Sequence, residues 1–150
     1  MILAESDRNM RDMVARFGVA IQSIYDDDPP FAYTVGLTLR KHPEIAIIGL
    51  SMQRSFPILN EMAEWVLGHG HVVEAGMTCR VQGLDFEFVD VIARSECFLT
   101  AHRFYGKRVN GLQAIWTDPH EDAHHRAGRA NPLRQPFLGI PAAWRQTADR

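Results

Sequence analysis

The sequence predicts an α+β fold: one domain with three helices and a mostly antiparallel sheet of about six strands, for which barrel-like closure is one outcome. Helical and strand periodicities alternate along the chain in the order α-β-β-β-α-β-β-α-β. Several neighbouring strands are joined by connections too short for a parallel crossover, which favours antiparallel pairing. The 150 residues, 46% of them hydrophobic, are enough for one core, so residues 1–150 are treated as a single domain.

The first half of the chain supplies a helix and three strands. Residues 6–17 repeat apolar side chains at helical spacing and predict an amphipathic helix. Residues 19–25 and 31–39 alternate apolar and polar positions as strands do, and the DDDPP turn at 26–30 separates them. Residues 44–50 are apolar on both faces, which is typical of a central strand.

The second half adds two helices and three strands. Residues 51–67 carry a buried helical stripe, and residues 77–92 form two strands around a tight QGLD turn. A third helix is expected over 95–105 and a further strand over 111–117. After that strand apolar residues become rare, so we expect a solvated loop, an extended segment at 133–141 and a frayed tail.

Composition excludes several classes of function. Lys and Arg number 16 against 18 Asp and Glu, so the net charge of −2 argues against nucleic acid and against an anionic membrane as partners. Cys79 and Cys97 are too few for a disulfide framework and are expected to be buried thiols. Neither a signal peptide nor a membrane span is evident, so a cytoplasmic location is expected. No phosphate-binding glycine loop occurs, and no cofactor is predicted.

The stretch DPHEDAHHR contains the letter pattern of a zinc-peptidase helix. In that pattern His120 and His124 would hold zinc one helical turn apart, and Glu121 would act as the base. Pro119 precedes the pattern, however, and no apolar residues follow at the spacing that would bury a helix. A polar loop without a native metal site is therefore the favoured interpretation. A zinc-dependent hydrolase, or adventitious metal binding, remains the alternative.

Polar residues next to aromatic ones predict a small-ligand pocket, because aromatic walls with a few polar anchors are the usual form of such sites. The candidates are Tyr33, Thr34, Gly36, Tyr105, Gln113, Trp116, Asp118, Arg134 and Gln135. In this hypothesis Arg134 holds a small anionic ligand bidentately, while Trp116 and Tyr105 offer stacking faces. The alternative is that Tyr33 and Trp116 are core residues and that Arg134 pairs with Asp118 at the surface.

Two further hypotheses follow from single residues and elements. A small hydrolase or transferase could use His42, or His102 near Tyr105, as general base, because histidine titrates near neutral pH. Sequence spacing identifies no partner carboxylate for either one. A homodimer formed through sheet edges or the first helix is an alternative of a different class.

Four blocks carry a resemblance to a known family: PPFAYTVGLT, HPEIAIIGL, LQAIWTDP and RQPFLG. Together they resemble the bacterial family catalogued as domain of unknown function 4262, over roughly residues 18–140. The resemblance implies a soluble α+β domain and no catalytic residues, since the family has no known activity. It favours the matching positions as fold- or site-determining: Tyr33, Thr34, Gly36, His42, Pro43, Trp116, Asp118, Arg134 and Gln135. The PHEDAHHRAGRAN loop departs from the family pattern, which weakens the zinc hypothesis.

Overall fold

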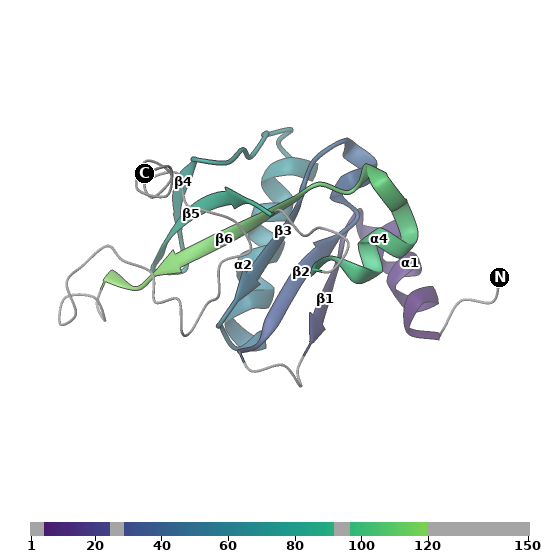
Figure 1. Ribbon diagram of the computed structural model, residues 1–150, viewed down its shortest axis with the longest axis horizontal. Coiled ribbons are helices and arrows are strands. Elements are labelled where there is room, and N and C mark those ends of the chain that lie inside the picture. The colour runs from purple at the N-terminus through teal and green to yellow at the C-terminus, as the bar shows by residue number, and fades with distance from the viewer. Residues whose placement is uncertain (1–4, 25–28, 92–96, 120–150) are drawn as a thin grey trace, which may run out of the picture.

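A six-stranded sheet in the order β1-β2-β3-β6-β5-β4 organises the chain in this computed structural model, which describes residues 5–24, 29–91 and 97–119 (Figure 1). The strands are β1 (Ala20–Ile24), β2 (Phe31–Val35), β3 (Glu44–Ile48), β4 (Thr78–Val81), β5 (Leu84–Asp90) and β6 (Gly111–Thr117). The helical elements are α1 (Glu5–Phe17), α2 (Met52–Leu67), α4 (Leu99–Tyr105) and the short 3-10 turns η1 (Leu37–Arg40) and η2 (Gly106–Arg108). The predicted α+β class and mostly antiparallel sheet are confirmed.

The sheet is open, so the expectation of barrel-like closure is wrong. β1 and β4 lie at opposite edges, and within the described sheet each pairs with a single neighbour. The last strand, β6, inserts in the middle, where it is parallel to β3 and antiparallel to β5. It therefore joins two antiparallel halves of the sheet, and among the described strands β1 and β4 have no partner on their outer sides.

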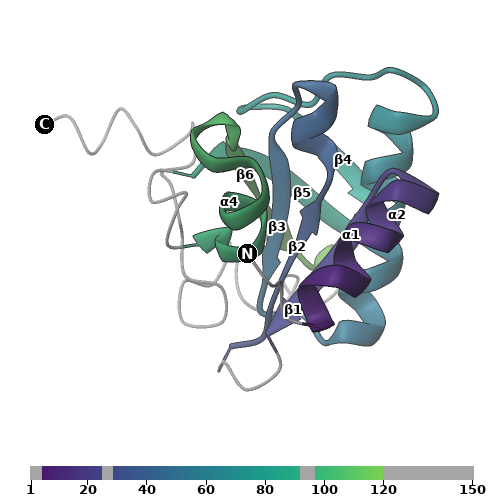
Figure 2. The ribbon, with the colours of Figure 1, turned by 90° about the vertical axis from the view of Figure 1, so that its right-hand side faces the viewer.

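Helices cover both faces of this sheet. Figure 2 shows α2 on one face and α4 on the other, with α1 beside the β1 edge. On the α2 side the core includes Ile45, Ile47, Ile58, Met62, Phe86, Leu112 and Trp116. On the α4 side it includes Val14, Tyr33, Val35, Ala46, Phe98 and Ala101. Side chains alternate between these two cores along each central strand, as the strand period requires.

The second strand is shorter than its alternating pattern predicted. β2 ends at Val35, because Gly36 adopts φ 129° and turns the chain into η1. Leu37 is then buried in the α2-side core, whereas Leu39 is 53% exposed. The apolar alternation of residues 31–39 therefore continues past the true strand end.

Candidate functional site

A fully buried carboxylate, that of Glu44, closes the turn after β2. Its side chain is 0% exposed. It accepts hydrogen bonds from the Thr34 hydroxyl at 2.9 Å and from the Gly36 amide at 3.1 Å. The Leu37 amide donates at 3.1 Å, and Thr38 donates through both its amide, at 2.9 Å, and its hydroxyl, at 2.6 Å. We call these five groups the Glu44 nest.

The Glu44 nest acts as an internal anchor. Burial raises the pKa of the Glu44 carboxyl, and the donors from Thr38, Thr34 and Gly36 oppose that rise. Thr34 is occupied on its other side as well, since its hydroxyl accepts from the Ile45 amide at 2.9 Å. At Gly36 a Cβ would lie 2.6 Å from the Gly18 carbonyl oxygen. Thr34 and Gly36 therefore hold the fold together at this turn.

His42 is a second buried polar residue of the same segment. The Val73 amide donates to Nε2 at 2.9 Å, so the ring proton lies on Nδ1, which donates to the Pro43 carbonyl at 2.8 Å. Burial lowers the pKa of His42 and favours this neutral form. Both ring nitrogens are thus engaged with backbone, and His42 ties the segment after α2 to the start of β3.

Tyr33 and Trp116 lie on opposite faces of the sheet. The Tyr33 hydroxyl accepts from the Thr100 amide at 2.9 Å, and its ring meets Phe98 edge-on with centroids 5.2 Å apart in the α4-side core. Trp116 lies in the α2-side core, where its Nε1 donates to the Ile48 carbonyl at 2.8 Å. The sheet separates these two side chains, so a single pocket does not include both.

The remaining predicted site residues are spread over the molecule. Gln113 is fully buried in register with Ala46, which in turn faces Tyr33, so these three form one row across the sheet. Tyr105 is partly buried beside Phe104, and burial raises the pKa of its hydroxyl. The other members are Asp118 and His102, both partly buried, and Arg134, Gln135, His120, Glu121 and His124, which lie outside the described residues.

A polar clamp between α1 and α4 was not predicted. Arg103 donates to both carboxylate oxygens of Asp7, at 2.8 and 3.1 Å, and to the Thr100 hydroxyl at 3.1 Å. Asp7 is only 7% exposed. Nearby, the Arg11 guanidinium lies 4.3 Å from the centroid of the Phe104 ring. These partners are more than ninety residues apart in the chain, so sequence spacing gives no signal for them.

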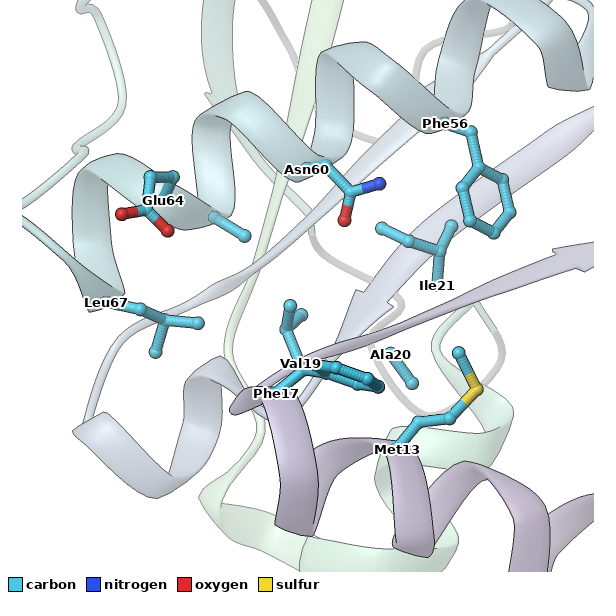
Figure 3. Close-up of a pocket in the computed structure, with 10 residues that line it drawn as sticks. Met13, Phe17, Val19, Ala20, Ile21, Phe56, Asn60, Glu64 and Leu67 are labelled. Atoms are coloured by element: carbon cyan, nitrogen blue, oxygen red, sulfur yellow. The ribbon is translucent and has the colours of Figure 1, made fainter.

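An apolar groove lies between α1 and α2, with β1 as its floor (Figure 3). We call it the α1–α2 groove; its volume is about 390 Å³. Met13 and Phe17 of α1 are 40% and 67% exposed along one wall. The other lining residues are Val19, Ala20, Ile21, Phe56, Asn60, Ala63, Glu64 and Leu67. Part of the apolar stripe of the predicted amphipathic helix thus lies at the surface.

A second cavity of about 450 Å³ adjoins the groove. Arg16 of α1 and Arg40 of η1 line it together with Leu39 and Gly36, and we call it the Arg16–Arg40 cavity. Phe17 and Leu67 line both cavities. Seven of the residues predicted to share a ligand pocket are described by the structure, and of these Gly36 alone lines either of the two cavities.

Comparison with known proteins places the chain in a family. The model of DUF4262, a domain of unknown function, matches residues 13–122. The chain is a DUF4262 domain. Neither a curated protein nor a solved structure matches it. The match confirms the resemblance to this family and includes three of the four sequence blocks; the fourth, RQPFLG, lies beyond residue 122, and a bacterial origin stays a prediction.

The DUF4262 region contains the Glu44 nest, His42 and all residues that line the two cavities. In this chain the most specific family block, FAYTVGLT followed by HPE, builds the nest and the His42 bridge. Residues 123–150 extend beyond the DUF4262 match. In the described ranges no three His, Cys, Asp or Glu side chains gather as a metal-binding group. Nor does any helix there have the length and apolar character needed to cross a membrane.

Proposed function

We propose that this DUF4262 domain binds a small molecule and that the α1–α2 groove holds its apolar part. The observation that carries the proposal is the exposure of Phe17 and Met13 in a concave site of about 390 Å³. Ligand sites are mostly apolar clefts of roughly 300–1,000 Å³ with a few polar groups. Asn60 and Glu64 supply such groups on the α2 wall.

The energetics favour an occupant for this groove. Covering an exposed aromatic or Met side chain stabilises a complex by about 1.5–3 kcal/mol at most. Met13 and Phe17 are four residues apart on α1, about one helical turn, so they are neighbours on the helix surface and one ligand can cover both. The proposal keeps the small-molecule class predicted from the sequence and moves the site away from Tyr33 and Trp116.

A neutral fluorescent probe, N-phenyl-1-naphthylamine, tests the groove. We expect its fluorescence to rise on binding, and Asn60→Trp, which fills the groove, to weaken binding about tenfold. Glu61→Trp is the matched control, because Glu61 is exposed on α2 and does not line the groove. Equal binding by both variants, or none by the wild type, would contradict the proposal.

The enzymatic alternatives have less support. Both ring nitrogens of His42 are engaged with backbone, and His102 lines neither cavity. The zinc hypothesis concerns His120, Glu121 and His124, outside the described residues; elemental analysis of untagged protein tests it. One equivalent of zinc, with a lower melting temperature after EDTA, would revive it. The cytoplasmic location and the homodimer stay predictions.

A further inference from the structure

We propose that the ligand is an amphiphile whose apolar chain lies in the α1–α2 groove and whose anionic head group lies in the Arg16–Arg40 cavity. This inference rests on the proposed function, because it names the ligand class of the same site. Three observations carry it: the two lining residues that the cavities share, the separation of charge between them, and the clustering of exposed apolar side chains.

The two cavities meet where α1 and α2 end. Phe17 is the last residue of α1 and Leu67 the last of α2, and both line both cavities. The chain packs closely there, since a Cβ on Gly18 would lie 3.1 Å from a Leu67 methyl carbon. In Figure 3 Phe17 and Leu67 lie on opposite walls of the groove. Gly18 and Leu67 close the space between the two cavities at this point, so a ligand that reaches both has to lie over the exposed Phe17 ring, which is 67% exposed.

Charge divides the site into two halves. The charged residues lining the second cavity are Arg16 and Arg40, and neither has an ion pair among residues 5–24, 29–91 and 97–119. The charged residue lining the groove is Glu64, on its α2 wall. The whole chain has a net charge of −2, so this local cationic character does not reflect the overall balance. An anionic group is attracted to the arginine end and repelled from the glutamate wall.

Exposed apolar side chains concentrate along the same path. Met13, Phe17 and Leu39 are 40%, 67% and 53% exposed. They are three of the six large exposed hydrophobic residues in the described parts of the chain, and all three line one or both cavities. Apolar side chains that are exposed around one site favour a binding function more than the same side chains scattered singly over a surface. Here the length of the site and its cationic end fit an apolar chain that carries one carboxylate or phosphate.

The position of Arg16 has a second explanation, which the experiment must distinguish from ligand binding. It lies in the last turn of α1, where a cation interacts favourably with the helix dipole. That explanation predicts lower stability for an Arg16 variant and no change in ligand selectivity. Arg40 also lies in the last turn of its element, η1, but four residues align few peptide dipoles, so the same explanation is weak for Arg40.

Three ligands with the same apolar chain provide the test: octanoate, 1-octanol and octyltrimethylammonium, each titrated by calorimetry below its micelle concentration. We expect octanoate to bind about tenfold more tightly than octanol, and the ammonium compound most weakly. The double variant Arg16→Gln/Arg40→Gln should bring octanoate to the affinity of octanol and leave octanol binding unchanged. Arg8→Gln/Arg54→Gln, which removes two exposed arginines outside both cavities, is the matched control and should bind as the wild type does.

The outcomes separate this inference from the proposed function. If all three compounds bind equally and Asn60→Trp blocks them all, the groove stands and the anionic head group is wrong. If none of the three binds while N-phenyl-1-naphthylamine does, the groove stands and the amphiphile is wrong; if the probe does not bind either, both proposals fail. Light scattering tests whether a second copy of the protein occupies the groove instead. A dimer that persists in octanoate but dissociates in the Asn60→Trp variant would assign the groove to a second copy. That result would overturn the amphiphile proposal.

Discussion

The Thr38 hydroxyl lies 2.6 Å from the Glu44 carboxylate, and both residues are buried. Every hydrogen bond that the structure gives to this carboxylate comes from a donor in the segment 34–38. The polar groups of residues 34–38, some of which were predicted to bind a ligand, are thus already hydrogen-bonded to the Glu44 carboxylate. We expect substitutions in this segment to change the free energy of unfolding more than any binding property.

Glu44→Gln should lower the free energy of unfolding by about 3 kcal/mol, because the amide nitrogen is a donor placed among donors. Urea denaturation measures the change. Glu61→Gln, at an exposed position of the neighbouring helix, should have almost no effect. Equal stability of the two variants would mean that the cost of burying the Glu44 charge cancels the gain from its five hydrogen bonds.

Gly36→Ala should destabilise the protein by about 2–4 kcal/mol, because its Cβ would meet the Gly18 carbonyl and because φ is 129°. The matched control is Gly76→Ala. Gly76 also has positive φ, at 93°, but nothing lies within 4 Å of its Cβ position, so that variant should cost about 1 kcal/mol. Thermal unfolding of the two variants separates backbone strain from steric conflict. Equal losses would show that Gly18 moves aside.

Stability should fall as the pH drops below about 6.5, because burial lowers the pKa of His42 in the folded protein. The unfolded chain then binds a proton that the folded chain excludes, and this loss continues until the pH reaches the folded-state pKa. Protonation of Nε2 would also remove the acceptor of the Val73 amide. Urea midpoints of wild type and His42→Phe between pH 5 and 7.5 measure the effect. Parallel pH profiles for the two proteins would assign the slope to other histidines.

Asp7 and Arg103 should show a coupling of about 1 kcal/mol in a double-mutant cycle of Asp7→Asn and Arg103→Gln. The Asp7 side chain is only 11% exposed and the pair is bidentate, whereas the Arg103 side chain is 54% exposed and partly screened by solvent. Arg80 and Asp85 form a matched control at 67% and 45% exposure, and their coupling should be smaller. A larger coupling in the control pair would show that burial of Asp7 contributes nothing.

The order and type of the helices and strands could be predicted from the sequence because their apolar residues recur at the helical or the strand period. The strand expected over 111–117 coincides with β6 residue for residue. The strand expected over 31–39 was too long, because Leu37 and Leu39 continue its alternation although Gly36 has already turned the chain. The order of the strands in the sheet could not be predicted from periodicity, because periodicity shows which face of a strand is buried but not which strands lie beside it.

The candidate site was harder to predict because it depends on contacts between residues that are distant in the sequence. Glu44 stands at the start of an apolar strand, and nothing in its neighbourhood along the chain shows that Thr34 and Thr38 will surround it. The α1–α2 groove depends on the distance between two helices some forty residues apart. The apolar spacing of α1 predicted burial for Met13 and Phe17 alike, because a helical stripe looks the same whether its partner is the core or a ligand.

The central place of β6 has a consequence during protein synthesis. β3 and β5 gain their shared neighbour only after residue 117 has left the ribosome, although both strands are made much earlier. Until then no strand can join the β1-β2-β3 unit to the β4-β5 pair, so the inner edges of β3 and β5 stay unpaired, and such edges promote aggregation. A chain that stops before Gly111 should therefore be insoluble rather than a smaller version of the domain, and chaperones should be needed most during the last part of translation.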